Sequence, residues 1–369
     1  MKYVVRILLV FVFILMILGA LLVFSASTTY SEVKFNNTYF LFNSHIWKVI
    51  GAIAALIIVS LIPYDYYKKF DKHFLLGIIL ILIVTFLLSS KLKGATRWIN
   101  IGIIQFQPSE MAKLILIIHL ANFIEKKGEL LKDFKKGYRY SLVSIFLISG
   151  LVYIQPNVST SIVIILTSLI LLYIGGSKIK YLLITLSTIL IIGTGFVMMF
   201  SHSRLRLLSY INSFLHGGEP NIQVLQAKIG LGSGGLLGVG LGQSRQSDLF
   251  LPEAHGDFIF SVLGEEFGFI GTITVLIIYL IIFFLGVIIA KKAKDNFGQI
   301  LGFGISINII VTAFIHTFVV LGLLPTTGIT LPFISFGGTS IIIFSVSVGI
   351  LVNIAKESLT YRRLLAENV

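Results

Sequence analysis

Long apolar runs separated by short charged segments recur along the whole of this 369-residue chain. An α-helix needs about 17 to 25 mostly apolar residues to span a bilayer, and ten runs reach that length. They cover approximately residues 7–26, 46–63, 74–90, 108–124, 139–155, 159–175, 180–201, 258–290, 300–323 and 335–355. We therefore predict an all-α integral membrane protein with about ten transmembrane helices.

The composition excludes the main alternatives to a membrane protein. Hydrophobic residues make up 56% of the chain and charged residues 12%, against about 25% charged residues in a typical soluble domain. A soluble fold of this length could not bury so many apolar side chains, and a disordered chain would be far more polar. The absence of cysteine also excludes disulfides, thiolate metal sites and cysteine nucleophiles.

The net charge of +13 is explained by a membrane rather than by nucleic acid. Basic soluble proteins often bind nucleic acid, but here the cations cluster between apolar runs, as expected for contact with lipid headgroups. With the N-terminus in the cytoplasm, nineteen lysines and arginines fall on the cytoplasmic side and nine on the outer side. This bias predicts that both termini are cytoplasmic and that the partners include membrane lipids and no nucleic acid.

No internal repeat or low-complexity tract divides the chain, so residues 1–369 are predicted to form a single polytopic membrane domain. The first run follows Lys2 and Arg6, as in a signal peptide, but it is long and many further runs follow, so we expect an uncleaved helix. The longest connection, residues 202–257, is predicted to be a large extracytoplasmic loop between the seventh and eighth helices. Long connections without obvious structure are usually functional.

Several cations fall on the outer side, where the charge bias does not expect them. An anionic ligand at the outer face would explain their position. These cations are Arg97, Arg204, Arg206, Lys228 and Arg245.

Two charged motifs precede and open the fourth run. Arg97 and Trp98 could contact a substrate, or Trp98 could be an ordinary interfacial anchor. Glu110 and Lys113 are three residues apart, so on a helix they share a face and can pair. An intramembrane charge is a candidate functional residue, and the alternative is a pair that only locks two helices together.

Ionisable residues gather at the start of the eighth run, namely Glu253, His255, Asp257, Glu265 and Glu266. A helix cap would explain Asp257 alone. A carboxylate at the membrane boundary, facing basic loop residues, is a credible general base. Asp257 is therefore the candidate catalytic residue, with Glu253 and His255 as candidate substrate contacts. Glu265 and Glu266 lie about two turns deeper and are predicted to support the structure or a polar cavity.

Glycine and proline mark two further segments. Residues 230–242 contain a G-x-G-x-x-G match with no strand before it, so we predict a close backbone approach or a sharp turn there. Their N–H groups, with Arg245 nearby, could hold phosphate. Residues 324–340 interrupt an apolar region, and such backbone at membrane depth must lie against protein or a cavity. His316, in the preceding run, is interpreted as a packing residue.

Several motifs, in this order, resemble the SEDS family (shape, elongation, division and sporulation), which includes FtsW and RodA. The resemblance extends from the first run to about Lys356. The residues of the motifs are more similar to the division branch of the family, FtsW, than to RodA. The motifs are residues 94–99 (GATRWI), 107–110 (QPSE) with Lys113, 251–260 (LPEAHGDFIF), 324–328 (LPTTG), 331–333 (LPF) and 337–340 (GGTS).

The resemblance implies ten transmembrane helices in the bacterial cytoplasmic membrane and a peptidoglycan glycosyltransferase activity on lipid II at its outer face. It implies that Asp257 is the catalytic acidic residue, and that Trp98, Glu110 and Lys113 belong to the site. It also implies a class B penicillin-binding protein, a transpeptidase, as partner. The sequence departs from the family pattern at Asn157, where an aspartate is usual, and at Gly256, where a threonine is usual.

The expected reaction joins a sugar hydroxyl to the anomeric carbon of lipid II and releases polyprenyl pyrophosphate. Asp257 would accept the hydroxyl proton, while Arg97, Arg204, Arg206 and Arg245 would stabilise the leaving group. The residues leave open whether a divalent cation takes part. The alternatives are a lipid II flippase, which should carry polar groups along its full depth, and a non-catalytic scaffold of the wall-synthesis machinery.

Overall fold

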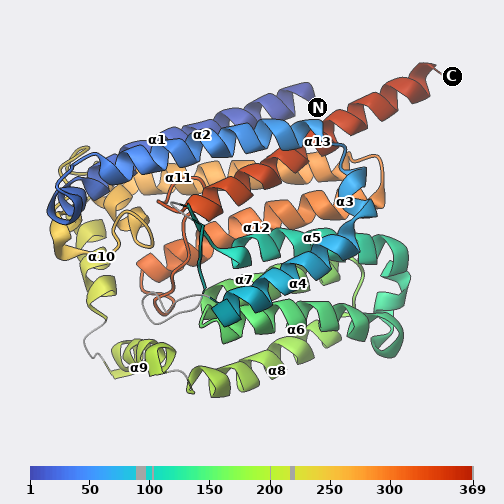
Figure 1. The fold of residues 1–369 in the computed structure, drawn as a ribbon, viewed down its shortest axis with the longest axis horizontal. Helices are drawn as coiled ribbons and strands as arrows, with labels where there is room; N and C mark the ends of the chain where they lie inside the picture. The colour runs from blue at the N-terminus through green and yellow to red at the C-terminus, as the bar shows by residue number, and fades with distance from the viewer. Residues whose placement is uncertain (89–96, 102–103, 200, 217–220, 368–369) are drawn as a thin grey trace.

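The computed structural model describes residues 1–88, 97–101, 104–199, 201–216 and 221–367, which form a bundle of long helices lying side by side (Figure 1). In this part of the chain, each predicted apolar run coincides with one helix. The helices are α1 (Lys2–Phe35), α2 (Phe40–Leu61), α4 (Asp71–Leu88), α5 (Pro108–Lys127), α6 (Arg139–Ile154), α7 (Val158–Ile174), α8 (Ile179–Val197), α11 (Ile259–Lys291), α12 (Asn296–Val320) and α13 (Gly338–Glu367).

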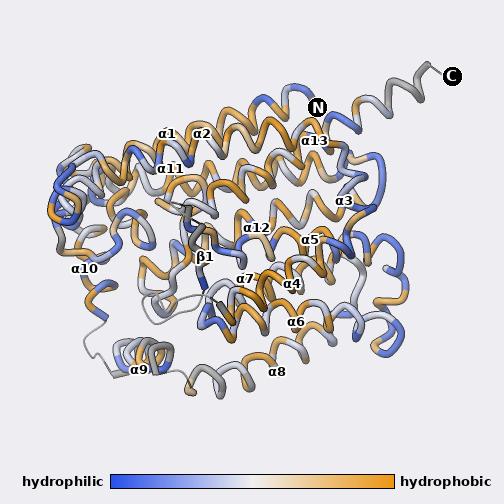
Figure 2. Tube along the Cα trace, viewed as in Figure 1, coloured by the Kyte–Doolittle hydropathy of each residue, from blue (hydrophilic) through white to orange (hydrophobic). Residues whose placement is uncertain are grey.

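Six helical segments in the described ranges are long and apolar enough to cross a membrane. They are α1, α2, the segment Phe134–Ile154 that contains α6, α11, α12, and Gly338–Tyr361 of α13. Figure 2 shows hydrophobic residues along the lengths of the helices and hydrophilic residues concentrated at their ends. This pattern is that of a multi-pass membrane protein.

Short helical pieces connect the long helices. Near the end of the bundle that holds both termini, these are α3 (Asp65–Lys69), the 3₁₀-helix η1 (Gly128–Lys132) and the π-helix η2 (Phe134–Tyr138). Helix α12 lies in the middle of the bundle, because it packs against α5, α7, α11 and α13. The predicted packing role of His316 on α12 agrees with its burial and with a 2.8 Å hydrogen bond between its Nδ1 and the carbonyl oxygen of Ile329.

The described residues are mostly helical, as predicted, but they include one pair of strands that the sequence did not predict. Strands β1 (Ile99–Ile101) and β2 (Ile104–Phe106) form an antiparallel hairpin, with Ile99 opposite Phe106. Both strands alternate apolar and polar residues, as a half-buried strand does. The segment is too short for that alternation to stand out beside the apolar runs.

The connection 202–257 is more structured than a long loop. It contains α9 (Ser201–His216), α10 (Ile222–Ser233) and the π-helix η3 (Gln246–Phe250). Helix α10 buries Val224, Ala227 and Gly230 and packs against α11. Tertiary packing therefore stabilises a helix too short to be recognised from its own periodicity.

Helix α11 is interrupted at Gly268, whose φ of 67° and ψ of −166° are not helical. The glycine-rich segment exchanges backbone hydrogen bonds with it there, including Val239 N to Glu265 O at 2.9 Å and Phe269 N to Gly235 O at 2.9 Å. A Cβ on Gly238 would lie 2.1 Å from the carbonyl oxygen of Glu266, closer than any side chain allows. The predicted close backbone approach is therefore confirmed, and it is an approach to α11.

Candidate active site

The carboxylate of Asp257 and the guanidinium of Arg97 meet beside Gly328. A Cβ placed on Gly328 would lie 3.4 Å from Asp257 Oδ2 and 3.7 and 3.8 Å from Arg97 Nη1 and Nη2. Both charged side chains are half-buried. Three motifs that are far apart in the sequence therefore come together at one point.

A tight turn positions Asp257 just before α11. Glu253 has a left-handed backbone, with φ of 59°, and its carbonyl oxygen accepts a 3.0 Å hydrogen bond from Gly256 N. Helix α11 is capped by Phe258 without a side-chain hydrogen bond, so Asp257 is not the cap residue. Its half-buried carboxylate is directed instead toward Gly328 and Arg97.

The irregular segment 324–340 holds this turn from the other side. Ser335 Oγ donates a 2.8 Å hydrogen bond to the carbonyl oxygen of Gly256, and Phe336 N donates one of 2.9 Å to that of His255. Ser335 Oγ also accepts from Leu331 N at 2.8 Å. The interrupted backbone thus lies against protein, as its position among apolar runs predicts.

Thr339, at the start of α13, connects the hairpin to the same segment. Its Oγ1 accepts a 2.9 Å hydrogen bond from Gln107 N and donates one of 3.2 Å to the carbonyl oxygen of Gln105. The hairpin begins two residues after Arg97. This anchorage fixes the strand pair that follows Arg97 against α13.

Aromatic rings surround His255. Its buried imidazole lies 5.3 Å from the ring of Tyr30 and 5.5 Å from that of Phe336. The Phe336 ring is also contacted by Lys48, whose Nζ lies 3.8 Å from the ring centre, a close cation–π contact. Lys48 was not among the predicted site residues, although a lysine within the predicted second helix was a signal that could have identified it.

Glu110 and Lys113 form the predicted pair, with 3.0 Å between the carboxylate and the ammonium. Both residues are buried on α5. Lys113 Nζ also lies 5.2 Å from the ring centre of Phe344 on α13. The pair therefore links two helices that flank the site.

Asn157 contacts the same end of α5. Its amide Nδ2 donates a 3.1 Å hydrogen bond to Ser109 Oγ, and its Oδ1 accepts one of 3.4 Å from Thr160 N. The second bond caps α7. An asparagine thus supplies both a donor and an acceptor at the position where the resemblance described above predicts an aspartate.

Glu265 and Glu266 hold the glycine-rich segment in place, as predicted for structural residues. Glu265 accepts hydrogen bonds from Ser233 Oγ (3.3 Å), Ser244 Oγ (2.5 Å), Arg245 N (3.2 Å) and Gln246 N (3.2 Å). Glu266 accepts from Ser25 Oγ and, at 3.1 Å, from Gly242 N. Of the glycine N–H groups predicted as phosphate donors, that of Gly242 is bound by a carboxylate of the protein itself.

The remaining predicted residues are less closely gathered. Trp98 is half-buried beside Arg97, whereas Arg204 on α9 and Arg245 before η3 are exposed. Arg206 is also on α9, but its side chain lies outside the described residues. Within the described ranges, no group of three or more His, Asp or Glu side chains is arranged to ligate a metal.

Together, the fold and the site define a multi-pass helical membrane protein with a carboxylate–guanidinium pair where the β-hairpin, the start of α11 and the segment 324–340 meet. The chain belongs to the FtsW, RodA and SpoVE family, described as "Cell cycle protein", which matches residues 5–360. The family predicted from the motifs is thus confirmed.

Relatives cover nearly the whole chain. It is 36% identical over 342 residues to "Probable peptidoglycan glycosyltransferase FtsW" of Geobacter metallireducens, covering 92% of this chain and 91% of that protein. It is 32% identical over 349 residues to "Stage V sporulation protein E" of Bacillus subtilis, covering 94% and 95% of the two chains.

Solved structures share the fold. One, described as "Structural coordination of polymerization and crosslinking by a peptidoglycan synthase complex", matches with a TM-score of 0.77 at 20% identity, over 95% of this chain and 97% of that chain. The crystal structure of the rod shape determining protein RodA from Thermus thermophilus matches with a TM-score of 0.70 at 20% identity, over 95% and 96% of the chains.

Proposed function

We propose that this protein is a peptidoglycan glycosyltransferase that polymerises lipid II at the outer face of the bacterial cytoplasmic membrane. The observation that carries the proposal is that the Asp257 carboxylate and the Arg97 guanidinium both lie within 4 Å of the position that a Cβ on Gly328 would occupy. Glycosyl transfer from a sugar pyrophosphate needs a base for the acceptor and a cation for the leaving group. The family relatives named as peptidoglycan glycosyltransferases support the same reaction.

In the proposed mechanism, a hydroxyl oxygen of the acceptor sugar attacks the anomeric carbon of the donor. Asp257 accepts the hydroxyl proton as the new C–O bond forms. The bond between the anomeric carbon and the pyrophosphate breaks, and its electron pair stays on the pyrophosphate oxygen. Arg97 stabilises that negative charge, so polyprenyl pyrophosphate leaves without being protonated first.

We propose that all ten apolar helices cross the membrane, with both termini in the cytoplasm and the connection 202–257 outside. The excess of lysine and arginine on the cytoplasmic side supports this orientation. It places Asp257, Arg97 and Gly328 at the outer surface. Trp98, Glu110, Lys113, Arg204, Arg206, Arg245, Glu253 and His255 are proposed to contribute to binding the substrate, directly or by fixing the helices around it.

We further propose that a class B penicillin-binding protein crosslinks the strands made here, in cell division rather than elongation. The matching structure of a peptidoglycan synthase complex supports a partner of this kind. The identity to FtsW relatives supports the division role.

The test is polymerisation of purified lipid II by the wild-type protein and by Asp257→Asn, with and without the partner transpeptidase. General-base catalysis contributes about 10²–10⁴-fold, so Asp257→Asn should lower polymer formation at least about 100-fold while its melting temperature is unchanged. Asp248→Asn is the matched control, because Asp248 is exposed on η3 and accepts a hydrogen bond from Thr29 Oγ1. Wild-type polymerisation by Asp257→Asn would refute the assignment.

A further inference from the structure

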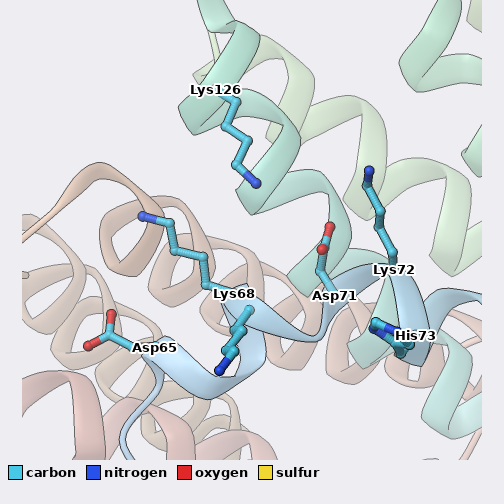
Figure 3. Close-up of a pocket in the computed structure, with 7 residues that line it drawn as sticks. Asp65, Lys68, Asp71, Lys72, His73 and Lys126 are labelled. Carbon is cyan, nitrogen blue, oxygen red and sulfur yellow. The ribbon is translucent and has the colours of Figure 1, made fainter.

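A basic pocket of about 480 Å³ lies where α3, the start of α4 and the end of α5 meet. Figure 3 shows Lys126 extending from α5 and Lys72 from α4, with Asp71 between them. The pocket is lined by Asp65, Lys68, Lys69, Asp71, Lys72, His73 and Lys126. Its volume lies within the range of small-ligand sites, about 300–1,000 Å³.

This pocket lies at the opposite end of the bundle from the candidate active site. Helix α5 begins beside the hairpin that follows Arg97 and reaches Lys126 in its last turn. Its 20 residues correspond to a length of about 30 Å. The two sites therefore lie at opposite ends of the bundle, which are opposite faces of the membrane in the orientation proposed above, and the pocket plays no part in the proposed reaction.

Each acidic residue of the pocket has a polar partner outside it. Asp65 forms an ion pair of 2.7 Å with Lys294, and Asp71 lies 3.3 Å from His119 Nδ1. Lys68 is likewise paired with Glu125, at 2.7 Å. The pocket is lined by four lysines and two aspartates, so with a neutral histidine it keeps a net charge of +2.

Lys72 and Lys126 are exposed, and neither forms an ion pair or hydrogen bond within the described ranges. They belong to different helices and face the same pocket (Figure 3). Two ammonium groups that line one pocket can bind an anion with several oxygens, because each can donate to a different oxygen. A phosphate group has this geometry.

The rim of the pocket is aromatic and apolar. Phe70 and Phe74 are 39% and 36% exposed, and Lys69 Nζ lies 5.6 Å from the ring centre of Phe70. Beyond the rim, α4 exposes further apolar side chains, including Leu76 and Leu80. A ligand that fits both parts has a phosphate at one end and acyl chains at the other, since the chains can follow α4 into the bilayer.

We propose that this pocket binds the phosphate headgroup of an anionic phospholipid from the leaflet on that side, which is the cytoplasmic leaflet in the proposed orientation. Lys72 and Lys126 contact the phosphate, and the acyl chains lie along Phe70, Phe74 and the exposed face of α4. A water-soluble phosphate ester could also place its phosphate group in this pocket. Only a lipid would in addition contact the apolar rim, and the rim therefore favours the lipid over the soluble ester.

The test measures binding of dioleoylphosphatidylglycerol to the full-length protein in a neutral detergent, by native mass spectrometry and by the shift in melting temperature. A lysine at an anionic membrane surface raises affinity about fivefold, so the double variant Lys72→Gln/Lys126→Gln should bind about 30-fold more weakly. Lys72→Arg/Lys126→Arg keeps both charges and should bind as the wild type does. This variant also controls for an effect of the substitutions on folding.

The matched control is Lys135→Gln/Lys136→Gln, which removes the same charge from exposed lysines outside the pocket. It should leave phosphatidylglycerol binding within about threefold of wild type. Glycerol 1-phosphate and dioleoylphosphatidylcholine serve as further probes. Stabilisation by phosphatidylglycerol alone supports the lipid, whereas equal stabilisation by glycerol 1-phosphate assigns the pocket to a soluble phosphate ester and overturns the lipid. Wild-type binding by the Lys72→Gln/Lys126→Gln variant, or equal losses in both Gln variants, would overturn the site itself.

Discussion

We expect substitution of Glu265 to destabilise the protein strongly, although Glu265 takes no part in the proposed chemistry. Its carboxylate accepts hydrogen bonds from two serine hydroxyls and from the backbone N–H groups of Arg245 and Gln246. The hydroxyls can rotate toward other acceptors, but the two backbone donors are fixed. Glu265→Ala leaves both without their acceptor.

The magnitude follows from those two donors. A buried donor left unsatisfied costs about 1–3 kcal/mol, so Glu265→Ala should destabilise the protein by about 4 kcal/mol. Glu265→Gln keeps one oxygen acceptor and should cost about half as much. At about 2.1 cal/mol/K of unfolding entropy per residue, a chain of 369 residues should lose about 5 °C in melting temperature with alanine.

The assay is thermal unfolding of the purified protein in detergent, followed by tryptophan fluorescence. Glu129→Ala is the control, because that carboxylate is 88% exposed and pairs only with Lys132 at the surface, where ion pairs contribute little. A melting temperature for Glu265→Ala within about 1 °C of wild type would refute the reasoning. It would mean that the glycine-rich segment is held by its backbone contacts alone.

Two further changes test the site and its surroundings. Gly328→Ala adds a methyl group in ordinary contact with Asp257 and Arg97, at 3.4 to 3.8 Å. Polymerisation of lipid II should fall about tenfold or more, because the methyl group occupies space proposed for the substrate, while the melting temperature stays the same. Full activity would contradict the proposal that the substrate's reacting atoms lie beside Gly328. Lys113→Met leaves the buried Glu110 carboxylate unpaired and should cost about 3–5 kcal/mol, most of which should be recovered in Glu110→Leu/Lys113→Met. A double variant at least as unstable as Lys113→Met would show that the pair does not act as a unit.

The apolar runs predicted the long helices well because lipid exposure leaves a signal along a helix's whole length. The same reasoning missed the hairpin at Ile99–Ile101 and Ile104–Phe106, because three-residue strands carry too few residues for a clear period. It also missed α10, whose helical state depends on packing against α11. Both elements depend on contacts with distant parts of the chain, which the local sequence pattern does not contain.

The candidate site was partly predictable. Asp257 and Arg97 could be selected as charges at the membrane boundary, but their meeting at Gly328 depends on how segments more than 70 residues apart fold back on one another. For the glycine-rich segment, the backbone geometry was predicted but the binding partner was not. Its close approach was predicted, yet the N–H group of Gly242 binds Glu266, and the backbone N–H groups of Arg245 and Gln246 just after the segment bind Glu265.

The order of synthesis gives the meeting point at Gly328 a consequence for biogenesis. Arg97, Asp257 and Gly328 leave the ribosome in that order, and the segment that carries Gly328 is anchored through Thr339 at the beginning of the last helix, α13. A nascent or truncated chain that lacks α13 also lacks this anchor between the hairpin and the turn before α11. We therefore expect polymerisation activity only in chains in which this final helix is in place, so that incompletely translated copies would not consume cell-wall precursor.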